Sequence, residues 1–351
     1  LDGLGHPLDA VNVAEDGPGG SAHFVLGAGS GGSLGSEPGD YLWRFSKSGY
    51  LGVCRRATLS AGEVVVIPNP WMERLSTLGH SLSLINDSTI SSMDGGLRFL
   101  FPGGSFTRAN DAFLTELHGQ ALPGPLPAGW SPLRSFHLAL PQEPLQAGAL
   151  TAALPAALSD GSEVALVSFD EANCEWMVNE VLTTGDGNVT APIAAMGSYA
   201  VVLADTGPTA PPAAVVGAAL PASAVTALLD DVTATGVVDP GETVASRVSA
   251  EVTSLATVGF EGQAAVPSGT WFQADVREEY ALSDGQSIVV PEFDQTYYAY
   301  RSLGSDANVV SAEFPVRPTL LFGPAELNVA RVRIDVLGRV RFAGGVVDPG
   351  G

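Results

Sequence analysis

Glycine and proline divide this sequence into short stretches. The chain has 42 Gly and 25 Pro among its 351 residues, and proline lacks the backbone donor that a helix interior or a central strand requires. Within the stretches, apolar and polar side chains alternate, most clearly at residues 331–336, and Tyr41, Trp43 and Phe45 fall on one face of a strand. This period of two is that of a half-buried strand. The sequence therefore predicts an all-β fold of short strands joined by Gly and Pro turns.

By its length the chain holds two or three domains, and the alternating stretches favour three consecutive β-sandwich domains. We predict a first unit over residues 1–80, a second over 81–205 and a third over 222–338. Thr, Ala and Pro dominate residues 206–221, and this composition predicts a stiffened linker. Residues 339–351 are expected to start a further strand or module.

Two motifs in the first unit are similar to a known family. They are G-x-P-L-x-x-V-x-V, which begins at Gly5, and G-D-Y-x-x-x-F-x-K-x-G-Y, which begins at Gly39. Together they resemble the carboxypeptidase regulatory-like, or transthyretin-like, β-sandwich family. The resemblance implies a non-catalytic accessory or spacer module of large secreted and surface proteins. A Gly- and Ser-rich loop over residues 16–39 stands where the family has a short turn and strand.

The second unit resembles ZU5-like β-domains in the order of its motifs. A hairpin with Phe169 and Trp176 is followed by a closing G-x-Y-x-V strand that begins at Gly197. Before them lies a proline-rich segment, residues 122–132, which we expect to be ordered and irregular, pinned by Trp130 and excluded from a central strand.

The third unit is predicted to be an immunoglobulin-like sandwich. Its expected strands cover residues 243–252, 270–282, 286–290, 296–301, 309–314 and 329–336.

The charge of the chain excludes two classes of partner. There are 38 Asp and Glu against 16 Lys and Arg, a formal net charge of −22. Such a chain repels nucleic acid and anionic membrane surfaces. We expect no nucleic-acid partner and, because no run of about 18 apolar residues occurs, no membrane insertion. The partners we expect are other domains of the same protein or neighbouring subunits.

Two cysteines, Cys54 and Cys174, leave two alternatives open. No CxxC motif and no Cys/His zinc spacing is present. A disulfide between them would tie the first unit to the second, and two separate buried thiols are the other interpretation. We expect an exported chain, a segment of a longer bacterial protein that is secreted or held at the cell surface.

One loop at the start of the third unit has the composition of a calcium site. Hard cations take several oxygen ligands from a flexible loop, and four acidic residues bracket this one: Asp230, Asp231, Asp239 and Glu242. The alternative is a plain capped turn. Calcium is the one metal that the sequence favours, and no other cofactor is predicted.

No catalytic residue is predicted. The G-x-G-x-x-G match at residues 27–32 is not followed by the helix that a dinucleotide site requires. None of the five histidines lies in a catalytic or zinc motif. We therefore expect that the protein is not an enzyme.

The leading hypothesis is a structural or adhesive segment that spaces or docks other modules. A second is a self-assembling extracellular fibre subunit, in which residues 339–347 complete a neighbour's sheet. A third is a carbohydrate-binding protein, or a glycoside hydrolase whose carboxylates come from distant strands. The aromatic residues available for sugar stacking are Trp71, Trp130, Trp271, Tyr297 and Tyr298.

Overall fold

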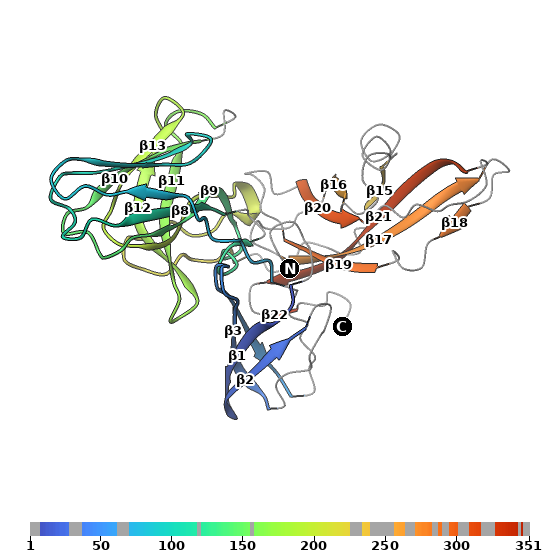
Figure 1. Cartoon of the computed structure of the whole chain (residues 1–351). Coiled ribbons are helices and arrows are strands. Elements are labelled where there is room, and N and C mark those ends of the chain that lie inside the picture. The colour runs from blue at the N-terminus through green and yellow to red at the C-terminus, as the bar shows by residue number, and fades with distance from the viewer. Residues whose placement is uncertain are drawn as a thin grey trace.

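The fold is all-β, as the sequence predicted (Figure 1). The computed structural model describes residues 8–27, 37–61, 70–117, 121–154 and 158–224, and the backbone of eight strands between residues 234 and 346. The strands form five antiparallel sheets, and two of the sheets pack face to face.

The first sheet has four antiparallel strands in the order β2-β1-β3-β4. Their bounds are β1 (Val11–Gly17), β2 (Gly20–Leu26), β3 (Gly39–Ser46) and β4 (Val53–Leu59). Alternate side chains of these strands bury one face around Trp43, and Met72 from the following segment covers it. The Trp43 Nε1–H donates to Glu15 Oε2 at 2.8 Å, so the buried indole keeps a hydrogen-bond partner.

The loop that we predicted over residues 16–39 is partly a strand. Gly17 and Gly20 pair across a two-residue turn, and β2 then runs back along β1. The sequence of β2 shows little alternation of apolar and polar residues, because most of its side chains are exposed and neither face is fully buried. Backbone pairing with β1 forms this strand.

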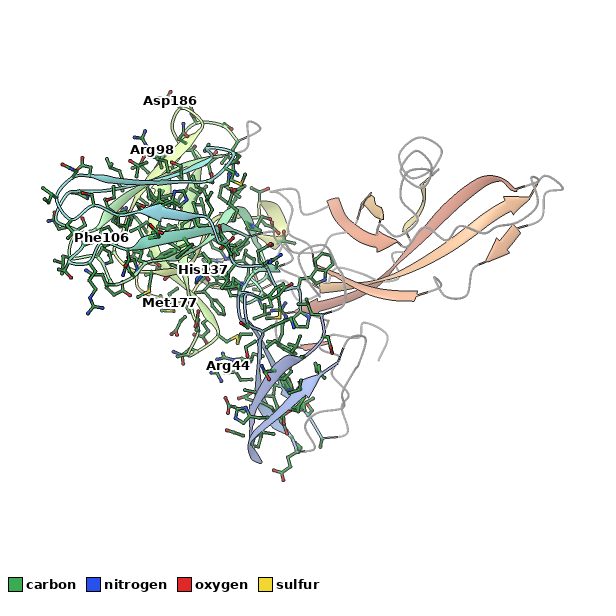
Figure 2. All side chains as sticks on the ribbon, viewed as in Figure 1. Arg44, Arg98, Phe106, His137, Met177 and Asp186 are labelled. Atoms are coloured by element: carbon green, nitrogen blue, oxygen red, sulfur yellow. A yellow bond between two sulfur atoms is a disulfide. The ribbon has the colours of Figure 1, made fainter. Side chains whose placement is uncertain are left out.

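The second unit is a sandwich of two sheets (Figures 1 and 2). One sheet is ordered β13 (Asn188–Ile193), β10 (Gly148–Ala153), β7 (Leu97–Phe101) and β6 (Ser88–Ser91). The other is ordered β12 (Glu175–Thr183), β11 (Glu163–Asp170), β14 (Gly197–Ala204), β9 (Trp130–Ala139), β8 (Asp111–Glu116) and β5 (Gly79–Ser81). Apolar side chains from both sheets form one core. Within it, Phe99 meets Phe136 edge to face at a centroid distance of 5.1 Å.

The proline-rich segment departs from its prediction at one end. Residues before Trp130 are irregular as expected, but Trp130 and Pro132 belong to β9, which is a central strand. The sheet tolerates Pro132 because the register with β14 shifts there and because β8 pairs only with the later part of β9.

The Pro- and Ala-rich segment that we predicted as a linker is not a free spacer. Its end pairs along β12: the Leu220 amide donates to the Trp176 carbonyl at 2.7 Å, and the Val178 amide donates to the Ala218 carbonyl at 2.9 Å. Leu220 is buried. The segment is ordered because it pairs with the outer backbone groups at the start of β12, which would otherwise be an open edge.

In the C-terminal part the longest strand is β21. One sheet is ordered β15 (Ala234–Val238), β21 (Leu327–Phe342), β17 (Trp271–Leu282) and β18 (Ser287–Val289), with β19 (Gln295–Tyr300) on β17 and β22 (Gly345–Val346) on β21. Strands β16 (Ala256–Gln263) and β20 (Val309–Val316) form a separate pair. The predicted strand over 243–252 lies outside the described residues. In the range 339–351, where we predicted the start of a further strand or module, residues 339–342 belong to β21, with residues 340 and 341 paired to β17, and β22 follows.

Candidate functional site

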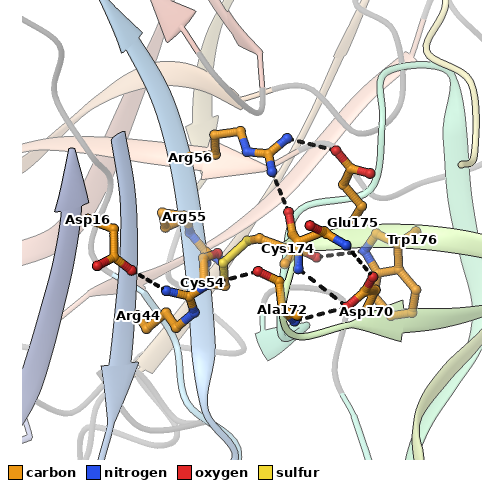
Figure 3. Close-up of a disulfide and its surroundings, with 12 residues drawn as sticks. Asp16, Arg44, Cys54, Arg55, Arg56, Asp170, Ala172, Cys174, Glu175 and Trp176 are labelled. Atoms are coloured by element: carbon orange, nitrogen blue, oxygen red, sulfur yellow. Dashed lines mark hydrogen bonds and ion pairs between the residues drawn. A yellow bond between two sulfur atoms is a disulfide. The ribbon is translucent and has the colours of Figure 1, made fainter. Parts of the chain in front are cut away.

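The best-defined site is the junction between the first sheet and the sandwich (Figure 3). Successive side chains of a strand point to opposite faces. Cys54 and Arg56 of β4 therefore share the face opposite the Trp43 core, and Arg44 of β3 joins them because it pairs with Cys54 in register. This face, defined by Arg44, Cys54 and Arg56, is directed at the sandwich, and Arg44 projects from the sheet on that side (Figure 2).

The sandwich meets this face with the turn between β11 and β12, residues 171–174. Asp170 organises the turn: its Oδ1 accepts from the amides of Ala172 at 2.9 Å and Asn173 at 3.3 Å. Its Oδ2 accepts from Asn173 Nδ2 at 2.7 Å. These bonds favour the ionised carboxylate, so the hydrogen bond from the Asn173 side chain, above all, lowers the pKa of Asp170 below its usual 3.8.

Arg44, Cys54 and Arg56 of the first sheet contact four consecutive residues of the sandwich, 172–175. We call this set of contacts the clasp. Arg44 donates to the Ala172 carbonyl at 2.8 Å, and Arg56 donates to the Asn173 carbonyl. The Cys54–Cys174 disulfide joins the sheets across 6.0 Å between Cα atoms. Arg56 also pairs with the Glu175 carboxylate at 2.7 Å. Of the two cysteine alternatives, the structure has the disulfide.

The ionic contacts of the clasp are weaker than the disulfide. The Arg56 and Glu175 side chains are 42% and 40% exposed, and exposed pairs of this kind contribute about 0–1 kcal/mol. A second ion pair, from Arg44 to Asp16 at 2.5 Å, lies within the first sheet and orients the guanidinium toward the turn. The arginines therefore set the register of the junction, and the covalent bond holds it.

An apolar cluster continues from the sandwich into the junction. Trp176 is its centre, 2% exposed, with its Nε1–H donating to the Gly124 carbonyl at 3.0 Å. Leu51 and Cys54 of the first unit belong to the same cluster. Gly124 is required at its position because a Cβ there would lie 2.4 Å from the Phe169 ring. The Cys54 amide donates to the Pro123 carbonyl at 2.6 Å, so backbone, core and disulfide meet at one point.

A pocket of about 390 Å³ opens beside the disulfide. Its walls are mostly apolar, from Pro125, Pro127, Trp176 and Leu220. The charge that Arg56 brings to it is paired with Glu175, and Trp176 donates its N–H elsewhere. Its lining residues include no histidine, serine or free carboxylate that could act as a nucleophile or a base.

One Ser–His pair lies elsewhere on the sandwich. His137 Nδ1 is 2.9 Å from Ser198 Oγ, on the adjacent strands β9 and β14. Burial lowers the pKa of His137, and no carboxylate contacts it in the described part of the chain. Ser198 is 2% exposed, so no substrate reaches its hydroxyl. The pair satisfies buried polar groups.

The described part of the structure does not include the predicted calcium site. Asp230, Asp231, Asp239 and Glu242 lie outside the described residues, and within the described part no group of three or more His, Cys, Asp or Glu is placed to hold a metal ion. In the same residues, no helix has the length and apolar character needed to span a membrane.

Of the five aromatic residues offered for sugar stacking, Trp130 is core: it is 4% exposed, and its Nε1–H donates to the Pro221 carbonyl at 2.6 Å. Trp71 is partly buried. The side chains of Trp271, Tyr297 and Tyr298 lie outside the described structure.

No known protein-family model matches this chain, and no curated protein is significantly similar to it in sequence. The resemblances to transthyretin-like and ZU5-like domains therefore remain predictions.

Replacing Asp170 by asparagine should remove a pH-dependent part of the stability. Because the folded pKa lies below 3.8, the carboxylate contributes stability that is present above the unfolded pKa and is lost as the pH falls through the folded value. The difference in unfolding free energy between wild type and Asp170→Asn should therefore be constant near neutral pH and should shrink below pH 3.8.

Urea unfolding followed by tryptophan fluorescence at a series of pH values measures this difference. Glu171→Gln is the matched control, because it neutralises a neighbouring carboxylate that accepts none of the three turn bonds. A difference that persists unchanged to pH 2 would contradict the assignment.

Proposed function

We propose that this chain is a non-catalytic structural segment that holds other modules, or neighbouring subunits, at a fixed spacing and orientation. The single observation that supports it best is the clasp, where one disulfide and two arginines join two sheets that are far apart in the sequence. A spacer needs a stiff joint between its units, and this joint is covalent.

The apolar cluster around Trp176 supports the same function. Domains that move relative to each other meet through small and rather polar interfaces, whereas here Leu51 and Cys54 enter the core of the neighbouring unit. The outer backbone groups at the start of β12, on Trp176 and Val178, are also occupied by the end of segment 206–221. Both features favour a joint that transmits orientation.

The disulfide is also consistent with an oxidising compartment, since such bonds persist in secreted and surface proteins and are rare in the cytosol. We propose an extracellular or cell-surface location, and a bacterial secreted or surface protein as the source of the segment. The sparse lysine and strong acidity of the chain fit a soluble surface spacer that does not bind nucleic acid.

The alternatives have less support. Residues 339–347 were the candidate donor strand of a fibre, but residues 340 and 341 already pair with β17, and β22 folds back on β21. For carbohydrate binding, Trp130 is committed to the core. The junction pocket has no pair of free carboxylates among its lining residues, so it does not favour a glycosidase.

Hydrogen exchange of the full chain tests the proposal. If the first sheet and the sandwich act as one stiff unit, the slow amides of β3 and β4 should open with the same free energy as those of β11 and β14. The double variant Arg44→Ala/Arg56→Ala should separate the two openings only slightly, because the disulfide remains. A first sheet that opens independently, with a much lower free energy in the oxidised wild type, would show a flexible joint and overturn the spacer function.

A further inference from the structure

The outer edge of β2 is the least protected sheet edge among the described strands of the first sheet and the sandwich. The other edges are short or partly protected: β5 and β6 have three and four residues, β13 contains Pro192, and segment 206–221 pairs with the first residues of β12. The β4 edge carries Arg56, and its Cys54 amide donates to the Pro123 carbonyl. Strand β2 has seven residues and, among the described strands, pairs only with β1. Natural proteins normally protect such an edge with proline, lysine or a covering segment.

The backbone of β2 offers a regular row of free groups. Gly17 and Gly20 close a two-residue hairpin turn, and a closing pair of this kind exchanges hydrogen bonds. Counting from Gly20, the N–H and C=O groups of Ser21, His23 and Val25 therefore face away from β1. A further strand could pair with all three residues without any change in the sheet.

The charge of the chain indicates which kind of partner would supply the added strand. The chain carries a net charge of −22, yet β2 contains no carboxylate and no lysine or arginine. Two carboxylates of the neighbouring strand β1 already accept bonds within the first sheet: Glu15 from Trp43, and Asp16 from Ser21 and Arg44. A basic partner would be drawn to the acidic surface instead of to this strand. A second acidic copy of this chain meets the least repulsion here.

We propose that β2 pairs with β2 of a second copy of this chain, antiparallel and about a two-fold axis, so that two first sheets become one continuous sheet. An isologous contact of this kind is self-complementary. A pairing centred on His23 places Ser21 of each copy opposite Val25 of the other and uses the free groups of both strands. The inference rests on the proposed structural function and names its partner as a neighbouring subunit.

The contact is small, so the dimer is weak and depends on concentration. A single added strand buries less surface than a stable standard interface. Salt should strengthen it, because it screens the repulsion between two acidic chains, and the paired strands themselves lose no ion pair. An interface built on ionic contacts would weaken with salt.

Sedimentation equilibrium of the full oxidised chain, over a wide concentration range and at low and high salt, tests the proposal. We expect a monomer–dimer equilibrium that shifts toward dimer with salt. Val25→Lys places a charge on the edge at a side chain that is 62% exposed, and it should weaken the dimer by about tenfold or more. His23→Pro removes an outward donor and should act in the same direction.

Ile85→Lys is the matched control, since Ile85 is an exposed aliphatic residue of the sandwich, 85% exposed, and the substitution adds the same charge. The dimer should be unaffected by it. A chain that stays monomeric at every concentration and salt, or a dimer that Val25→Lys leaves intact, overturns the proposal. If His23→Pro fails to fold, Val25→Lys still decides. Hydrogen exchange across the clasp is measured separately, so a stiff monomer would leave the spacer function standing and remove only the dimer.

Discussion

Replacing Cys54 and Cys174 together by alanine should lower the free energy of unfolding by about 4 kcal/mol. The two cysteines are 120 residues apart in the sequence, and a cross-link that closes so long a loop restricts the unfolded chain strongly. Alanine avoids a new buried hydroxyl at Cys54, which is almost fully buried. The effect is a large fraction of the stability of a typical domain.

Urea unfolding of the oxidised wild type, the reduced wild type and the double variant measures this contribution. The reduced protein and the double variant should unfold at similar urea concentrations, because both lack the same cross-link. The control Arg44→Ala/Arg56→Ala keeps the disulfide and should lose far less stability. An oxidised wild type that unfolds at the same urea concentration as the variant would mean that the bond does not constrain the unfolded chain.

Replacing Trp176 by alanine should destabilise the chain by about 3–5 kcal/mol, the range for removing a large buried aromatic side chain. Trp176 packs against Phe169 at a centroid distance of 5.1 Å and donates to the Gly124 carbonyl. Its loss leaves a cavity where the sandwich meets the first unit, and it leaves that carbonyl without its donor. The junction should weaken as well as the sandwich.

Trp176→Phe separates the two effects. It removes the Nε1–H donor together with part of the indole and keeps an aromatic ring at the site, so we expect a smaller loss of about 1–3 kcal/mol. Thermal unfolding gives the stability, and hydrogen exchange at β4 shows whether the first sheet is affected. If Trp176→Ala destabilises the sandwich but leaves the exchange of β4 unchanged, the apolar cluster does not couple the two units.

Several elements were predictable because one local rule decides them. Tyr41, Trp43 and Phe45 recur at every second position, and all three point into the core of the first sheet. Leu97, Phe99 and Phe101 do the same in β7. In such strands one face is buried, so burial imposes the period of two on the sequence.

Other elements could not be predicted, because their stability comes from partners that are distant in the sequence. Strand β2 is exposed and pairs through its backbone, and Pro132 enters a central strand only because a register shift accommodates it. The segment 206–221 has the composition of a linker, yet the free edge of β12 orders it.

The junction likewise combines local features that the sequence predicts with long-range contacts that it does not. The spacing of Cys54 and Arg56 places both on one face as soon as β4 is recognised as a strand, and this signal was available in the sequence. Asp170 and Asn173 likewise form a turn by local hydrogen bonds. No local feature of the sequence predicts that this turn and this face contact each other.

By itself, the sequence determined the all-β class, the buried faces of the regular strands and the residues able to form a disulfide, because alternation, turn chemistry and cysteine count act within a few residues. The tertiary structure alone decided that Cys54 lies beside Cys174, that Trp176 joins two cores and that the edge of β2 stays unpaired in the described chain. These depend on how sheets pack and on which edges they leave open, and such contacts join residues that are far apart along the chain.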